Sequence, residues 1–338
     1  MPRYLIRRLG QAVLVVAGVI ALTFVIMRLV PGDPAVAYAG PKAGPAELAQ
    51  ARARFGLDDP VWTQLWNYVR DLFSGDWGTS LHTRQPVAHD LATAFPASLE
   101  LVGAALIVAV LAGVPLGILA ARYHTKFPDL SVRLSSMLAV SVPVFWLALA
   151  VQTLFASTLG WFPVAGEYDT RLDVTSPLHV YTNITAVDAL LTGNWPILTS
   201  TLAHLVLPAL VVAAYPAGLI AQMTRAALIE ETGRDHTRME RALGFGETAL
   251  LTRFALRPAA APVLSLIALV FAYAIVNGFL VEAVFNWPGL GRYAADSIRS
   301  LDTPAIAGVT LLVALLYVVA NLVVDLLQSL IDPRVRTR

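Results

Sequence analysis

The 338-residue sequence contains no cysteine, and this absence removes several classes of chemistry at once. Disulfide bonds, thiol nucleophiles and thiolate metal ligands are all excluded. Lysine is nearly absent as well, since Lys42 and Lys126 are the only two. Neither lies in a G-x-x-x-x-G-K-[ST] phosphate-binding loop, and no HExxH motif or Ser/His/Asp arrangement stands out. We therefore expect no catalytic residue, no metal ligand and no bound cofactor in this chain.

Charge is also scarce. Charged residues make up 14% of the chain and apolar residues 57%, and the mean hydropathy is +0.66. Soluble proteins contain roughly a quarter charged and about half apolar residues. The composition therefore indicates an integral membrane protein.

Six apolar stretches have a length of about 20 residues, which is enough to cross a bilayer as a helix. We expect these spans near Leu9–Val30, Ala97–Ala121, Leu134–Leu159, Thr201–Thr224, Ala259–Val281 and Ala305–Leu327. The first stretch is longer than the apolar part of a signal peptide and lacks a convincing small-residue cleavage site, so we expect it to stay as an anchor. The sequence predicts an all-α membrane protein with six spans.

The distribution of Lys and Arg predicts the orientation of these spans. About 15 of them lie in the N-terminus, residues 122–133, residues 225–257 and the C-terminal tail, against about 8 in the longer opposite loops. Basic residues concentrate on the cytoplasmic side, so both termini are expected there. Of the two outer segments, residues 31–95 are expected to form short helices on the membrane surface, and residues 160–200 a structured cap.

A few polar residues fall within the expected spans. We expect Arg28 to extend its side chain to the membrane interface, and His204 to form a hydrogen bond with a neighbouring helix. Asn321 and Asp325 lie one turn apart, and pairing with neighbouring helices is the favoured interpretation. A substrate contact by Arg28 and proton transfer by His204 remain alternatives.

The segment from Asp235 to Pro262 places a dense cluster of charge between two apolar stretches. Its spacing predicts a short amphipathic helix that ends at Gly244, followed by a second helical run that begins at Glu247. A helix, a glycine turn and a helix at the inner membrane surface would form a docking element. The residues that we expect to form it are Asp235, Arg238, Met239, Glu240, Arg241, Ala242, Gly244 and Phe245.

The segment from Glu282 to Tyr293 is rich in turn-forming residues, and we expect it to interrupt the helix. We interpret it as a re-entrant hairpin that acts as an outer gate, with Trp287 and Tyr293 as anchors at the membrane interface. An ordinary extracellular hairpin is the alternative. The gate residues are Glu282, Phe285, Trp287, Pro288, Gly289 and Gly291.

Several short motifs carry a family resemblance that covers the chain from end to end. Residues 285–291 match F-x-W-P-G-L-G, and the other motifs are YLIRRL (4–9), VPGDP (30–34), FGLDDP (55–60), GDWGTS (75–80) and DPRVR (332–336). In this order they resemble the first permease subunit of dipeptide or oligopeptide ATP-binding-cassette (ABC) importers. Residues 238–240 are Arg-Met-Glu where that family's coupling loop has Glu-Ala-Ala.

The resemblance implies a six-helix type I ABC importer transmembrane domain with a family-specific N-terminal helix and outer-face insertions. It divides the chain into residues 1–96, with the first helix and an extracytoplasmic segment, residues 97–328, the permease domain, and residues 329–338, a cytoplasmic tail. The implied partners are a homologous second permease, two ATPase subunits that bind ATP and Mg, an extracytoplasmic substrate-binding protein and membrane lipid, without nucleic acid. The implied location is the bacterial plasma membrane.

The resemblance implies that the chain itself is not an enzyme and that it helps to import di- or oligopeptides. Nickel, glutathione or another small solute remain alternative cargoes. Two other classes stay open, an ion-coupled secondary transporter and a sensor or scaffold protein. A secondary transporter is expected to show buried acidic residues near the bilayer centre and repeated broken helices, and the sequence shows neither clearly.

Overall fold

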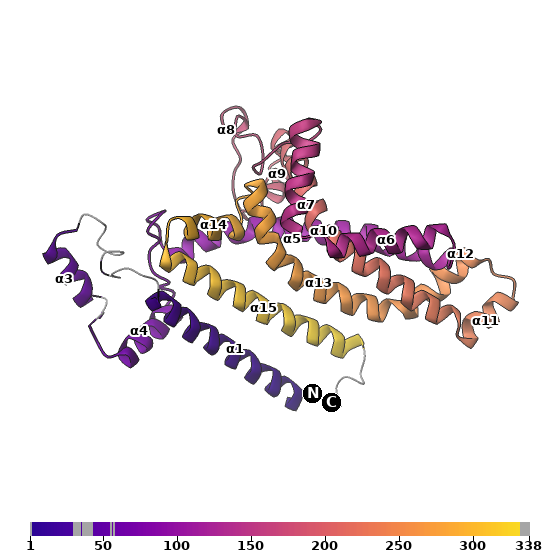
Figure 1. Cartoon of the computed structure of the whole chain (residues 1–338), viewed down its shortest axis with the longest axis horizontal. Coiled ribbons are helices and arrows are strands. Elements are labelled where there is room, and N and C mark those ends of the chain that lie inside the picture. Colours follow the sequence, from indigo (N-terminus) through magenta and orange to yellow (C-terminus); the bar gives the residue numbers. More distant parts are fainter. Residues whose placement is uncertain (1, 30–34, 36–42, 55, 57, 332–338) are drawn as a thin grey trace. The chain divides into compact units, whose positions relative to one another are not determined.

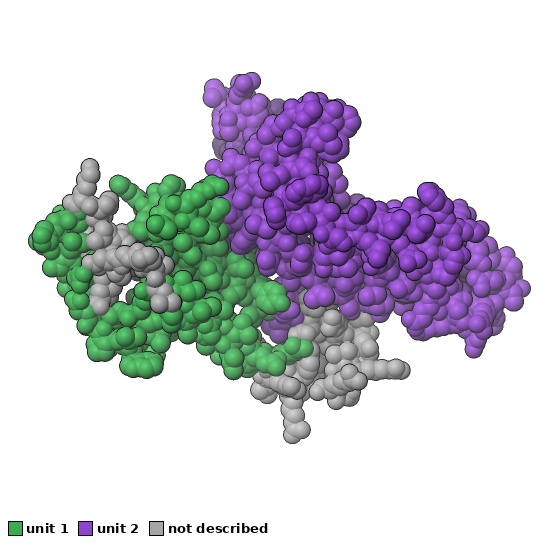
Figure 2. All heavy atoms as spheres, in the orientation of Figure 1, with its two compact units in different colours: residues 1–95, 293–319 green, residues 96–292, 320–338 purple. Residues whose placement is uncertain are grey.

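The computed structural model describes residues 2–29, 35, 43–54, 56 and 58–331. These residues are mostly helical and contain no strand, apart from an isolated bridge between Thr79 and Pro86. They divide into two units (Figure 2). Unit 1 consists of residues 1–95 and 293–319, and unit 2 of residues 96–292 and 320–338. Each unit is described by itself.

Five helical segments are long and apolar enough to cross a membrane, and a bent pair of helices brings the number to six if the pair counts as one span. Among the described residues, the six predicted spans therefore correspond to these five segments and the bent pair. The five are α1 (Pro2–Leu29), α5 (Val87–Arg122), α10 (Trp195–Thr232), α13 (Leu256–Phe285) with the short turns α12 (Glu247–Ala249) and η2 (Leu250–Ala255) before it, and α15 (Thr303–Ile331) (Figure 1).

The third expected span, Leu134–Leu159, is not a single helix, so that prediction is wrong. α6 (Phe127–Ser141) is followed by α7 (Val144–Val151) and the π-helical segment η1 (Gln152–Thr158), with a bend of 104° between them. Pro143 explains the break, because proline has no N–H to donate and disfavours a helical conformation at the preceding residue. Val142 is accordingly extended, with φ −79° and ψ 128°.

Helices α5 and α10 extend beyond the apolar stretches that predicted them. α5 has 36 residues and begins at Val87 rather than Ala97, and α10 has 38 and continues to Thr232 rather than Thr224. Hydropathy finds the apolar middle of a helix, whereas capping fixes its end. At the start of α10, Asn194 accepts a hydrogen bond from the Ile197 amide at 3.3 Å, which satisfies a donor that the first helical turn leaves free.

Small residues bring α10 close to two neighbours in unit 2. A Cβ atom at Gly113 of α5 would lie 2.8 Å from the Ala217 carbonyl, and one at Gly117 would lie 2.7 Å from the Ala221 carbonyl. This G-x-x-x-G spacing allows two membrane helices to pack backbone against backbone. A Cβ atom at Gly218 would lie 3.1 Å from a backbone atom of α6, so α10 also packs tightly on α6.

The described parts of the two outer segments contain helices, as predicted, whereas the position of the first segment on the membrane surface stays a prediction. The first contains α3 (Pro45–Arg54) and α4 (Val61–Phe73) in unit 1, and Tyr68 of α4 donates a 3.4 Å hydrogen bond to Thr23 of α1. The second contains α8 (Leu172–Thr175) and α9 (Thr185–Leu191) in unit 2 (Figure 1). Its buried Asp188 accepts hydrogen bonds from the backbone amides of Tyr181 and Thr182. We call residues 160–200 the cap.

The cap is fastened to the end of α13 within unit 2. The Gly166 amide donates to the Phe285 carbonyl at 2.9 Å. The side-chain amide of Gln152 donates both to the Val164 carbonyl at 2.9 Å and to the Val284 carbonyl at 3.1 Å. These bonds use the last carbonyls of α13, which have no partner within their own helix. The cap is therefore part of the folded transmembrane unit.

Candidate functional site

The predicted docking element forms a separate short helix, α11 (Asp235–Ala242), which lies at the end of α10 (Figure 1). Gly244 follows the helix with φ +91°, a left-handed conformation that glycine adopts without strain. A second helical run then begins at Glu247. The helix–glycine–helix arrangement predicted from the sequence is confirmed, whereas its role in docking is not tested by the fold.

The surface of α11 and its turn is unusual, because large apolar side chains are exposed among charges. Met239 is 63% exposed, Leu243 66% and Phe245 40%. The Phe245 ring lies 5.0 Å from that of Phe254, and Arg241 pairs with Glu247 at 2.8 Å across the turn. An exposed apolar cluster within a charged rim is typical of a surface that binds another protein. We call α11 and residues 243–247 the knob.

The joint between α10 and the knob is short and internally bonded. The buried Thr237 hydroxyl donates to the Glu231 carbonyl at 2.9 Å, which links α11 back to the last turns of α10. Arg234 pairs with both Glu230 and Glu231 at 3.0 Å. These contacts connect the knob to the last turns of α10.

The expected gate residues form a turn between two helices. α13 continues through Glu282 to Phe285, so the expectation that the helix cannot pass through Glu282 is wrong. It ends at Asn286, which is left-handed with φ +54°. α14 (Leu290–Arg299) follows, and Gly291 lies inside this helix rather than interrupting it. We call residues 286–290 the outer turn.

Trp287 is completely buried, so the prediction that it anchors the turn at the membrane interface is wrong. Its indole N–H donates to the Ala97 carbonyl of α5 at 2.8 Å. A buried tryptophan normally requires such a partner. Neither the burial of Trp287 nor its partner on α5 could be read from the motif, because the two residues are far apart in the sequence.

A buried carboxylate completes the outer turn. Glu282 is fully buried, and its Oε2 accepts a 2.6 Å hydrogen bond from the Gly291 amide. The Ser98 side chain bonds the same carboxylate and accepts from the Leu290 amide at 2.8 Å. A Cβ atom at Gly289 would overlap Glu282 and Ser98. Glycine at position 289 is therefore required by packing.

Glycine is required at position 291 for a different reason. A Cβ atom there would overlap the backbone of Phe279 in α13. A backbone obstacle cannot move aside as a flexible side chain can. Gly291 thus allows α14 to start directly against α13.

In unit 1, the GDWGTS motif (75–80) is also bonded to a buried carboxylate. Ser80, the last residue of GDWGTS, donates to the buried Asp302 at 2.5 Å, and the His82 amide donates to the same carboxylate at 3.1 Å. The Tyr293 hydroxyl donates to Asp90 at 3.1 Å, and burial is the main cause of its raised pKa. Tyr293 therefore has a partner in the protein. Sequence reasoning missed Asp302, which lies outside any motif.

Two of the polar residues in the expected spans have partners within the protein. His204 Nδ1 lies 2.8 Å from the Ser200 carbonyl of its own helix, so the predicted bond to a neighbouring helix is wrong; the carbonyl one turn earlier is the nearest partner. The Arg28 guanidinium bonds the Gln64 side chain and lies over the Phe24 ring, 4.8 Å from its centre. The side chain of Asp325 lies outside the described part of the chain.

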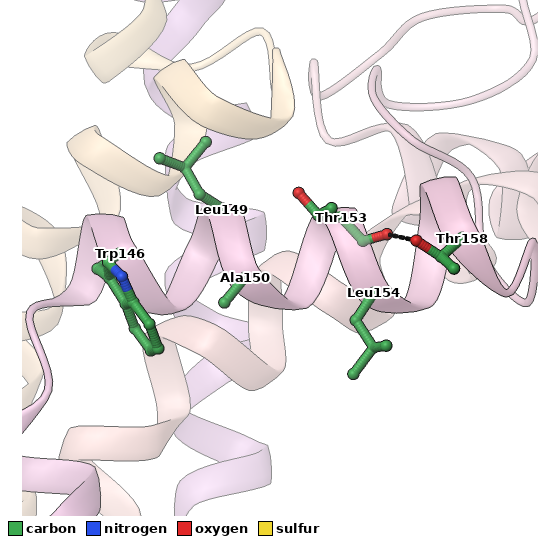
Figure 3. Close-up of a pocket in the computed structure, with 6 residues that line it drawn as sticks. All are labelled: Trp146, Leu149, Ala150, Thr153, Leu154 and Thr158. Carbon is green, nitrogen blue, oxygen red and sulfur yellow. Dashed lines mark hydrogen bonds between the residues drawn. The ribbon is translucent and has the colours of Figure 1, made fainter.

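A shallow depression on α7 and η1 offers little for binding a charged solute (Figure 3). It is lined by Trp146, Leu149, Ala150, Thr153, Leu154 and Thr158. The Thr158 hydroxyl already donates to the Thr153 carbonyl at 2.9 Å. Among the residues that the structure describes, no cluster of three or more His, Asp or Glu side chains could hold a metal ion.

Comparison with known proteins is consistent with these features. Residues 113–337 match the family described as binding-protein-dependent transport system inner membrane component. Residues 1–102 match the N-terminal domain described for the same membrane components.

Full-length relatives agree with this match. A probable D,D-dipeptide transport system permease of Escherichia coli is 42% identical over 97% of this chain and 96% of its own. A di/tripeptide transport system permease of Pseudomonas aeruginosa is 37% identical over 99% of both chains. A dipeptide transport system permease of Alkalihalophilus pseudofirmus is 36% identical over 99% of this chain and all of its own. The chain belongs to the family of binding-protein-dependent transport system inner membrane components.

Proposed function

We propose that the chain is a permease subunit of an ATP-driven importer and forms half of a translocation pathway for di- or oligopeptides. The names of three relatives at 36–42% identity, which describe dipeptide or di/tripeptide transport, support this cargo. An extracytoplasmic binding protein delivers the peptide. The chain lies in the bacterial plasma membrane with both termini in the cytoplasm, in agreement with the distribution of basic residues.

The knob is the observation that carries this proposal. Its exposed Met239, Leu243 and Phe245 provide apolar anchors, and its charged rim provides complementary contacts for a cytoplasmic ATPase. Two ATPase subunits dock below this chain and a homologous second permease. Hydrolysis takes place in those subunits, since this sequence has no phosphate-binding loop. This chain converts the movement of the ATPase subunits into a rearrangement of its own membrane-spanning helices.

The mechanism follows from the connection between the knob and α10. Closure of the ATPases displaces the knob, and the Thr237–Glu231 bond passes this displacement to α10. The spans then move as rigid bodies around the pathway, in a cycle of alternating access. The outer turn, which Glu282 and Gly291 flank, closes the outer mouth, and the bonds of Trp287 and Leu290 to α5 make it move together with that helix.

Uptake of radiolabelled Ala-Ala by cells that lack their own dipeptide permease tests this function. Cells that produce the chain with its partner subunits are expected to accumulate the peptide. Cells in which Met239 and Leu243 are both replaced by Asp are expected to lose uptake, although the chain remains in the membrane. A matched control replaces Leu191, an exposed leucine of the cap, by Asp. Equal uptake with and without the chain would contradict the proposal.

A further inference from the structure

An ion pair between a buried carboxylate and a partly exposed arginine joins α6 to α10 within unit 2. Asp129, in the first turn of α6, is 2% exposed, and Arg225 of α10 is 19% exposed. Arg225 Nη2 donates to Asp129 Oδ2 at 2.8 Å, and its Nε donates to Oδ1. Two parallel bonds between a guanidinium and a carboxylate form the strongest and most directional ion pair available to side chains. The sequence alone places Arg225 at the edge of a cytoplasmic loop, whereas the structure places it inside a helix.

The same carboxylate also fixes the turn between α5 and α6. The Thr125 amide donates to Asp129 Oδ2 at 3.0 Å. Thr125 has φ +66°, a left-handed conformation that is strained for a residue with a branched side chain. Asp129 therefore holds the α5–α6 turn and α10 together.

Close packing surrounds this ion pair. Ala120 of α5, Val132 of α6 and Ala221 of α10 form one buried cluster. Removal of Arg225 would leave the buried Asp129 carboxylate without its counter-charge, which costs more than breaking an exposed pair. The α6–α10 contact is thus resistant to sliding or separation.

The ion pair lies on the route from the knob into the spans. α10 continues from Arg225 to Thr232, and the Thr237–Glu231 bond links its end to α11. α6, on the other side of the pair, runs to the 104° break before α7. A displacement of the knob therefore reaches α6 through α10 and this contact.

We infer that Asp129 and Arg225 are positioning residues of the transport cycle, which make α6 move together with α10 when the knob is displaced. This inference rests on the proposed function. Neither residue needs to touch the peptide or the ATPase. Their effect is on coupling, the amount of peptide moved for each ATP hydrolysed.

The test uses the assembled transporter, with all its subunits, in liposomes. Four variants separate charge, geometry and pairing: Arg225→Ala, Asp129→Ala, Arg225→Lys and the exchanged pair Asp129→Arg/Arg225→Asp. The matched control is Arg299→Ala, because Arg299 is 76% exposed and pairs with Asp296 at 3.3 Å. Chain levels in the membrane are compared by immunoblot. The exchanged pair provides a charge-balanced variant if either single variant does not fold.

Coupling is the first readout, measured as Ala-Ala uptake per ATP hydrolysed. We expect each alanine variant to lower it at least about tenfold, and the exchanged pair to recover part of this loss, because arginine at position 129 restores the ion pair but cannot accept the Thr125 hydrogen bond. Arg225→Lys should give an intermediate value, because an ammonium cannot form the two parallel bonds. Arg299→Ala should match wild type.

The second readout is a distance between spin labels on Ser131→Cys of α6 and Ala226→Cys of α10, which uses the absence of native cysteine. In wild type this distance should be the same with and without trapped nucleotide, and in Arg225→Ala it should differ between the two states. An unchanged distance in Arg225→Ala, or normal coupling in both alanine variants, overturns the inference. If wild-type ATP hydrolysis does not respond to loaded binding protein, the proposed function fails as well.

Discussion

The indole of Trp287 and the backbone carbonyl of Ala97 are joined by a 2.8 Å hydrogen bond between the outer turn and α5. Trp287→Phe keeps an aromatic ring but loses the donor and leaves the pocket partly empty. We expect the free energy of unfolding to fall by about 1–3 kcal/mol. Thermal unfolding of purified protein in detergent measures this effect. Trp161→Phe, at an exposed position of the cap, is the control, and equal stability of the two variants would contradict the role of the bond.

Glycine substitutions test the packing of the outer turn. Gly291→Ala should be more harmful than Gly289→Ala, because the added methyl meets the backbone of Phe279 rather than side chains. We expect a loss of at least about 1–3 kcal/mol for Gly291→Ala. Gly103→Ala, in open space on α5, should be neutral or slightly stabilising. The order is measured by the temperature of unfolding, and a reversed order would refute this explanation.

Two substitutions in the knob are expected to disturb coupling between ATP hydrolysis and uptake. Gly244→Val forces a branched side chain into φ +91°, although the space around Gly244 is open. Glu240→Lys reverses a charge on α11. Both variants should insert normally and uncouple ATP hydrolysis from Ala-Ala uptake. Normal uptake in both would remove the assignment of residues 235–251 as the ATPase docking element.

Movement of the outer turn can be followed by labelling. Asn286 is exposed, whereas Leu290 is fully buried. Asn286→Cys should react with an impermeant maleimide at different rates with and without trapped ATP, while Leu290→Cys should react slowly in both states. Equal rates for Asn286→Cys in the two states would show that the turn is static and does not act as a gate.

The cap should loosen as the pH rises. Burial raises the pKa of Glu167 above its ordinary 4.5, and its side chain bonds Thr185 at the start of α9. The contribution of Glu167 to stability is complete below pH 4.5 and is lost as the pH rises through the raised pKa, because the unfolded form ionises first. The protection of amides 181–191 against hydrogen exchange, relative to the intrinsic exchange rate at each pH, should fall over this interval. Glu167→Gln should remove this fall in protection, and an equal fall in that variant would contradict the prediction.

The sequence predicted the approximate positions of the five continuous spans because apolar length is sufficient to identify a membrane helix. It also predicted α11 and its end at Gly244, because the helical spacing and the glycine lie within ten residues of each other. A complete break at Pro143, rather than a kink, was not predicted, since proline occurs within continuous helices too, as at Pro208 and Pro216 of α10. The apolar composition of a stretch does not show whether its helix continues straight or bends at a proline.

Buried polar contacts could not be predicted for a different reason. Glu282, Asp302 and Arg225 each bind a partner that is 9 to 222 positions away in the sequence. Their partners are decided by how the helices pack, which a single sequence does not specify. The motif around Trp287 identified the family but suggested an exposed ring, because tryptophan is common at membrane interfaces.

The bend at Pro143 has a consequence for the surrounding lipid. α6 has 15 residues, and α7 with η1 has 15 more, so each arm is at most about 22 Å long, whereas the hydrocarbon core is about 30 Å thick. Neither arm can match the bilayer by itself. Lipid next to this region must become thinner or be replaced by protein, and transport should therefore depend on acyl-chain length. Bilayers of short-chain lipid are expected to favour the bent form.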